Sequence, residues 1–189
     1  MIVIAISIQT TLNIVSTRKG YGLSKPVQVA AVILNVTLLV AYEQRFGFSI
    51  NILLLSLASC ILISTFFVDF KHYIIPNGYN LTLFLIAIAF VLNNLEYWQT
   101  HVKGGVFFFL SFLVLLMISG GNLGAGDVKM SVSLGLFLGS SAFMNYMVVT
   151  FLSCALASIC LLILKLKKKE DKIAFGPYMI MGFIWLLPW

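Results

Sequence analysis

Two aspartates lie at the ends of apolar segments, where a charged group is costly and is a functional candidate. Asp69 directly follows the apolar run 61–68, and Asp127 lies in the glycine-rich segment 120–130, just before another apolar run. Two carboxyl groups close together in a partly dry site cannot both ionise easily. One then keeps its proton while the other takes a proton from a shared water. We therefore expect a pair that can hydrolyse a peptide bond without a metal.

Two other interpretations of the aspartates stay open at this point. Each carboxylate could cap a helix or pair with a lysine such as Lys71 or Lys129. A small multi-pass transporter or proton-conducting protein could also use Asp69 and Asp127 as relay groups. Relay carboxylates usually lie near the middle of the membrane, often on broken helices. Here both acids are expected at the same boundary, which favours the hydrolytic pair.

The residues around the acids support a particular arrangement. Gly124 and Gly126 precede Asp127 in a GxGD element, and small residues allow a substrate backbone to approach closely. Lys129 is either an orienting group for the pair or a basic anchor at the membrane surface. After Asp69 a polar hinge leads to Pro76 and Asn77, and a proline can start a helix without continuing one.

The composition identifies the elements that must position these residues. Of 189 residues, 61% are hydrophobic and 10% are charged, whereas a soluble domain is about 25% charged. This excludes a soluble globular enzyme and a disordered chain. At about 20 residues per spanning helix, the chain fits an all-α polytopic transmembrane bundle of about eight spans, with seven as the alternative. The apolar runs are residues 1–15, 27–42, 50–68, 78–95, 104–119, 129–142, 144–164 and 173–188.

The basic residues orient these spans. Cytoplasmic loops of membrane proteins are rich in lysine and arginine. Eight spans with the N-terminus outside place ten of the twelve basic residues in cytoplasmic loops and leave only Arg45 and Lys103 outside. The net charge of +6 is thereby explained without a nucleic-acid partner. Arg18 and Lys19 follow the first apolar run, whereas a cleaved signal peptide carries its charge before it, so we expect a retained first helix in a multi-pass protein of the cell membrane.

Together these motifs resemble the type IV prepilin peptidase family, membrane aspartyl proteases of the GxGD kind. In that family an acid stands shortly before a Pro-Asn or Pro-Asp pair, as Asp69 does here, and a second acid lies in GxGDxK, as in residues 124–129. A softer match is the Phe-Gly-Pro element at residues 175–177. The matches occur in the family's order over residues 11–183.

The resemblance implies an aspartic-type endopeptidase, formed by the single domain 1–189, with Asp69 and Asp127 as its catalytic acids. It implies a prepilin or pseudopilin substrate with a basic leader and a hydrophobic helix, cut at the cytoplasmic membrane boundary among lipids. No metal or cofactor is expected. Full-length bacterial members carry a cytoplasmic insert with two CxxC pairs, associated with N-methyltransferase activity. Here residues 16–26 take its place, so we expect the peptidase without the methyltransferase. A non-catalytic assembly partner derived from the peptidase is the remaining alternative.

Overall fold

The computed structural model describes residues 2–121, 123–166 and 173–187. These residues form α-helices joined by short connections, with one 3-10 turn at Leu95–Tyr97 and no strand among them. The all-α class is therefore confirmed, as are eight helical elements within the described part of the chain. The helices are α1 (Ile2–Arg18), α2 (Lys25–Phe46), α3 (Ile50–His72), α4 (Asn77–Asn93), α5 (Trp98–Ile118), α6 (Ala125–Leu138), α7 (Phe143–Ile163) and α8 (Gly176–Leu186).

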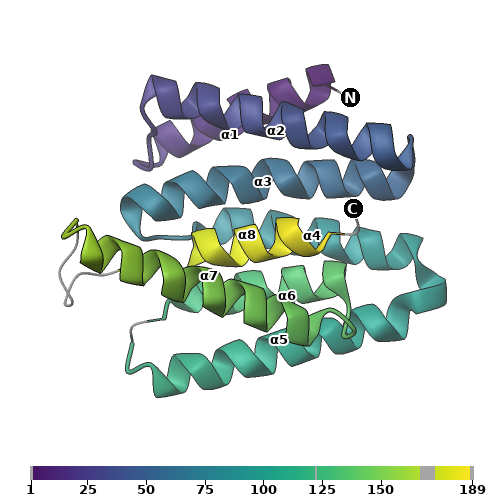
Figure 1. The fold of residues 1–189 in the computed structure, drawn as a ribbon. Coiled ribbons are helices and arrows are strands. Elements are labelled where there is room, and N and C mark those ends of the chain that lie inside the picture. The colour runs from purple at the N-terminus through teal and green to yellow at the C-terminus, as the bar shows by residue number, and fades with distance from the viewer. Residues whose placement is uncertain (1, 122, 167–172, 188–189) are drawn as a thin grey trace.

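Successive helices run up and down, so every other connection lies at the same end of the bundle (Figure 1). The α1–α2, α3–α4, α5–α6 and α7–α8 connections share one end, which we call the basic end because Arg18, Lys19, Lys25 and Lys71 lie there. The α2–α3, α4–α5 and α6–α7 connections lie at the opposite end (Figure 1). The basic residues 167–172 and the terminal residues 188–189 lie outside the described residues.

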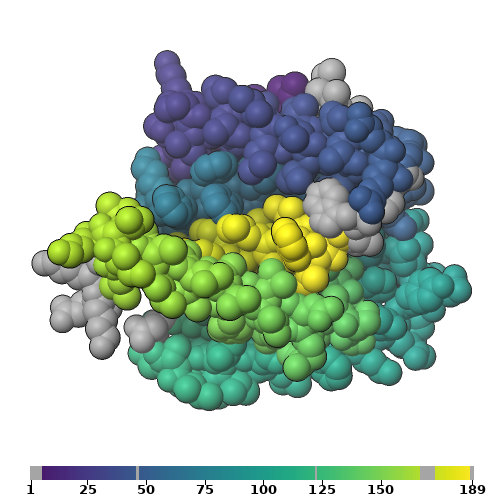
Figure 2. Space-filling model, in the orientation of Figure 1, coloured from purple at the N-terminus to yellow at the C-terminus, as the bar shows by residue number. Residues whose placement is uncertain are grey.

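Four helices among the described residues are long and apolar enough to cross a membrane, spanning Lys25–Arg45, Ile50–His72, Leu95–Ile118 and Phe143–Ile163. Helices α4 and α8 are apolar but shorter. Helix α7 leaves Leu152, Leu156 and Ile159 exposed, an arrangement that suits a surface facing lipid. Figure 2 shows α8 exposed between α2 and α7 on one face of the molecule. The protein therefore has the features of a helical membrane bundle.

Helices α5 and α6 cross at unusually short range through their glycines. A Cβ atom added to Gly135 would lie 2.6 Å from the carbonyl oxygen of Gly104 and 2.8 Å from the Phe108 ring. Small residues at such crossings let two backbones approach closely inside a membrane. Helix α6 also contacts α4 and α8, so it is surrounded by the bundle. Its N-terminus, which carries Asp127, is fixed by this packing.

The helices that carry the two aspartates each extend about four residues beyond the expected boundary nearest the acid. Helix α3 continues past residue 68 to His72, and the N–H of Tyr73, in left-handed conformation (φ 57°), donates to the Asp69 carbonyl at 2.8 Å. Basic residues in the last turn, here Lys71 and His72, interact favourably with the helix dipole. Helix α6 begins at Ala125, before the expected residue 129. Both aspartates therefore lie inside terminal helical turns, not in flexible loops.

Candidate active site

Three helix ends meet at the basic end of the bundle. The C-terminal turn of α3 carries Asp69, the first turn of α6 carries Asp127, and α8 begins beside them at Gly176. Helix α3 packs against α4 and α8, and α6 packs against α4 and α8. Both aspartates are buried, with 5% of Asp69 and 7% of Asp127 exposed. The fold thus gathers two buried carboxyl groups from segments far apart in the sequence.

The Asp69 carboxylate is held by the start of the last helix. Its Oδ2 accepts a hydrogen bond of 3.0 Å from the backbone N–H of Gly176, 107 residues further along the chain. A Cβ atom added to Gly176 would lie 2.6 Å from the same oxygen. The absence of a side chain at this position therefore permits the contact.

The Asp127 carboxylate uses only one of its oxygens within the described residues. Its Oδ2 accepts a hydrogen bond of 3.1 Å from the N–H of Gly124, which precedes α6. Its Oδ1 is buried and has no hydrogen-bonding partner there. A carboxylate is favoured at a helix N-terminus by the dipole, whereas a buried unpaired oxygen is costly. The arrangement leaves one acceptor available to a water or a substrate.

The two carboxyl groups are close enough for the charge of Asp69 to act directly on Asp127. Ile75 packs against residues next to both acids. A Cβ on Gly126 would lie 2.9 Å from Ile75 Cβ, and a Cβ on Gly176 would lie 3.3 Å from Ile75 Cδ1. The open side of Gly126 is thus filled by the chain's own Ile75. Gly126 therefore does not provide the free path for a substrate backbone that is expected from the sequence.

Among the other residues singled out from the sequence, Asn77 and Lys129 connect α4 to α6. Pro76 precedes α4 with φ −62°, and Asn77 is its first residue. Asn77 Oδ1 accepts a hydrogen bond of 2.9 Å from Lys129 Nζ. Lys71 Nζ donates to the carbonyl oxygen of Gly22 at 2.7 Å. Both lysines considered as partners for the aspartates therefore donate hydrogen bonds to other groups.

The interpretation of each aspartate as a helix cap is correct for one oxygen of each carboxylate. Asp127 caps its own helix, and Asp69 accepts from the first residue of α8. Capping and reaction chemistry do not exclude each other, because a carboxylate has two oxygens with about four lone-pair positions. Anchoring one oxygen fixes the direction of the other.

Sequence reasoning missed two supporting residues and the role of a third. Asn80 is buried, and its Nδ2 donates to the carbonyl oxygen of Gly126 at 3.0 Å, next to Asp127. A lone amide one turn inside an apolar helix was a usable signal for it. Gly176 was noticed only as part of a Phe-Gly-Pro element, and its contact with Asp69 has no local signal. Ile75 resembles any other apolar residue.

The described part of the chain contains no group of three or more His, Cys, Asp or Glu side chains that could hold a metal ion. The residues gathered here are two carboxyl groups, two amides, backbone N–H groups and one lysine. Such groups can bind water, an extended peptide or a proton.

The chain is similar to two curated proteins, each named prepilin leader peptidase/N-methyltransferase. It is 28% identical over 153 residues to the protein from Legionella pneumophila, covering 77% of this chain and 53% of that protein. It is 27% identical over 157 residues to the Bacillus subtilis (strain 168) protein, covering 82% and 63%. The matches thus span between half and two thirds of the relatives' length. No solved structure gives a significant match.

The family profile provides the decisive comparison. Residues 56–162, more than half of the chain, match the type IV leader peptidase family. This range contains Asp69 and Asp127, all of α6 and the part of α3 from residue 56 onward. The resemblance inferred from the motifs is confirmed: the chain belongs to the type IV leader peptidase family.

Proposed function

We propose that this protein is a membrane-embedded aspartyl endopeptidase in which Asp69 and Asp127 form the catalytic pair. The observation that carries the proposal is the meeting of two buried carboxyl groups, from α3 and α6, in a chain of the type IV leader peptidase family. Like charges in a shared, partly dry site favour a state with one proton between them. That state supplies an acid and a base together.

In the proposed reaction, the ionised carboxylate takes a proton from water, and the resulting hydroxide attacks the scissile carbonyl carbon. The protonated carboxyl group donates to the carbonyl oxygen, and the amine leaves with a proton from the pair. The products are a free carboxyl group and a free amine. The two aspartates titrate as a unit. The unpartnered Oδ1 of Asp127 is a suitable place for the water.

Lys129 and the residues opening α4 would act through position. The Lys129–Asn77 hydrogen bond and the Asn80–Gly126 hydrogen bond both tie α4 to the first turn of α6. Such ties hold Asp127 against the segment that follows Asp69. A displacement of about 1 Å in a catalytic group can cost 100-fold in rate, so these links contribute to activity without touching the reacting atoms.

The proposed substrate is a prepilin or pseudopilin with a short basic leader and a hydrophobic helix. With the basic end in the cytoplasm, as the lysine and arginine distribution favours, the N-terminus lies outside and the site lies at the inner face of the cell membrane. The leader then stays cytoplasmic, so its junction with the apolar helix reaches the depth of the carboxyl groups. We propose peptidase activity without methyltransferase activity, carried by residues 1–189 as one domain. Residues 16–26 stand where the full-length bacterial members described above carry the insert that is associated with methyltransferase activity.

The test is cleavage of co-expressed prepilin-like substrates, followed by size on a gel, with Asp69→Asn and Asp127→Asn. Asparagine keeps an oxygen that can accept the Gly176 or Gly124 N–H, so we expect normal insertion. Cleavage should fall by roughly a thousandfold or more in each variant, because one half of the acid–base pair is lost. Glu96→Gln, which removes an exposed charge at the opposite end, is the control. Near-normal turnover by either asparagine variant would exclude the pair.

A further inference from the structure

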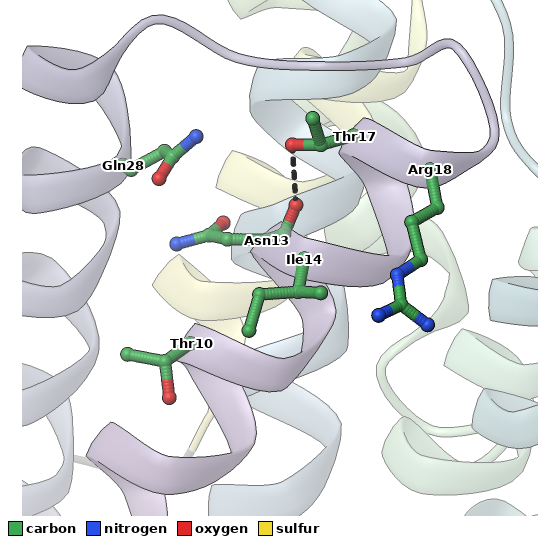
Figure 3. A pocket seen from close by; sticks show the side chains of 6 residues that line it. All are labelled: Thr10, Asn13, Ile14, Thr17, Arg18 and Gln28. Atoms are coloured by element: carbon green, nitrogen blue, oxygen red, sulfur yellow. Dashed lines mark hydrogen bonds between the residues drawn. The ribbon is translucent and has the colours of Figure 1, made fainter.

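A pocket of about 420 Å³ lies against the basic end of α1, and neither aspartate is among the residues that line it. It is lined from α1 and from the first turns of α2 (Figure 3). The lining residues are Thr10, Asn13, Ile14, Thr17, Arg18 and Gln28. A pocket of this size can hold a small polar group with part of an apolar tail.

The pocket presents hydrogen-bond acceptors that the protein leaves unused. Asn13 is 5% exposed, and its buried Oδ1 has no hydrogen-bonding partner among the described residues. Gln28 donates through Nε2 to the carbonyl oxygen of Leu23 at 2.9 Å, so its Oε1 remains as an acceptor. The Thr17 hydroxyl donates to the backbone carbonyl oxygen of Asn13 at 2.8 Å. A ligand here must bring its own donors, since a buried amide oxygen is costly without one.

One cation completes the lining. Arg18, at the end of α1, is the only charged residue among the six, and no acid faces it from the pocket wall. A guanidinium group recognises phosphate through two parallel hydrogen bonds. Ile14 and the threonine methyl groups add an apolar strip beside it. Phosphate, hydroxyl donors and an apolar portion are therefore the complementary features of a ligand.

We propose that this pocket binds an anionic phospholipid with a glycerol headgroup, of the phosphatidylglycerol type. Its phosphate binds Arg18, its headgroup hydroxyls donate to Asn13 Oδ1 and Gln28 Oε1, and its acyl region follows Ile14. The basic end attracts anionic lipid in general, and the amide oxygens add selection for hydroxyl groups. An ethanolamine headgroup fits less well, because it would bring a second positive charge beside Arg18, and the lining holds no carboxylate to offset it. This proposal does not depend on the proposed function.

The experiment measures lipid retention on the purified full chain by native mass spectrometry, with phosphatidylglycerol, phosphatidic acid and phosphatidylethanolamine as probes. We expect one tightly held phosphatidylglycerol, and roughly tenfold weaker retention in Arg18→Gln, because a charge-assisted contact is lost. Lys19→Gln is the matched control, since it removes the same charge one residue along and lines a separate pocket. Asn13→Leu should weaken phosphatidylglycerol about two- to tenfold and leave phosphatidic acid, which lacks the hydroxyls, unchanged.

Several results would overturn the proposal. Equal losses in Arg18→Gln and Lys19→Gln would show general surface attraction. Equal retention of phosphatidylglycerol and phosphatidylethanolamine would remove the headgroup selectivity. Displacement of the lipid by inorganic phosphate at millimolar concentration would assign the site to a free anion. If Asn13→Leu fails to fold, the comparison of Arg18 with Lys19 still decides the result.

Discussion

Gly176→Ala should selectively damage the site through a single added methyl group. The new Cβ would lie 2.6 Å from Asp69 Oδ2 and 3.3 Å from Asp69 Cγ, whereas ordinary contacts begin at 3.4 Å. The carboxylate must therefore retreat by about 0.8 Å, close to the displacement that costs about 100-fold in rate. We expect cleavage of a prepilin-like substrate to fall roughly 100-fold.

Stability should change much less than activity in this variant. Overpacking costs about 1–3 kcal/mol, while alanine is better than glycine in a helix by up to about 1 kcal/mol. The net loss in the free energy of unfolding is then about 2 kcal/mol or less, measurable as a modest shift of thermal unfolding in detergent. Activity and stability are measured on the same preparation.

Gly78→Ala is the matched control for Gly176→Ala. Gly78 also lies in the first turn of a helix at the basic end, and nothing lies within 4 Å of a Cβ built there. We expect wild-type cleavage and equal or slightly higher stability. If Gly176→Ala cleaves within twofold of Gly78→Ala, then the position of Asp69 relative to α8 does not matter for catalysis, and the geometric argument is wrong.

Two further substitutions test the packing around the site. Asn80→Leu removes the donor to the Gly126 carbonyl oxygen at 3.0 Å. We expect the free energy of unfolding to fall by about 1–3 kcal/mol, and cleavage to fall by more than the loss of folded protein explains. An unchanged cleavage rate per folded molecule would contradict this. Gly104→Ala brings a Cβ against the backbone of Gly135 and Gly139, which cannot yield as a flexible side chain can. The midpoint of thermal unfolding in detergent should fall by an amount that corresponds to about 1–3 kcal/mol. An unchanged midpoint would show that α5 and α6 separate without cost.

The positions of the helices follow from hydropathy, because an apolar run inside a bilayer must satisfy its backbone hydrogen bonds internally and therefore forms a helix. Which side of each helix faces the protein does not follow. Phe107 and Phe108 are adjacent and chemically identical, yet Phe108 is fully buried and Phe107 is 46% exposed. In a membrane, lipid and protein interior are both apolar, so the sequence carries little contrast between the two faces.

Candidate acids were detectable because a carboxylate at the edge of an apolar run has a high solvation cost. Their anchoring groups were not, since a backbone N–H leaves no mark in the sequence. The Asp69–Gly176 contact joins residues 107 positions apart and depends on how α8 packs on α3. Helix ends were misplaced by about four residues for a related reason: hydropathy falls where charges begin, but α3 continues through Asp69 to His72.

The contact between Asp69 and the start of α8 also sets the order in which the parts of the site come together. Because a chain is made from its N-terminus, both acids are added before residue 176, and the group that orients Asp69 is the last part of this contact to be made. Completion of the site waits for the last helix to dock.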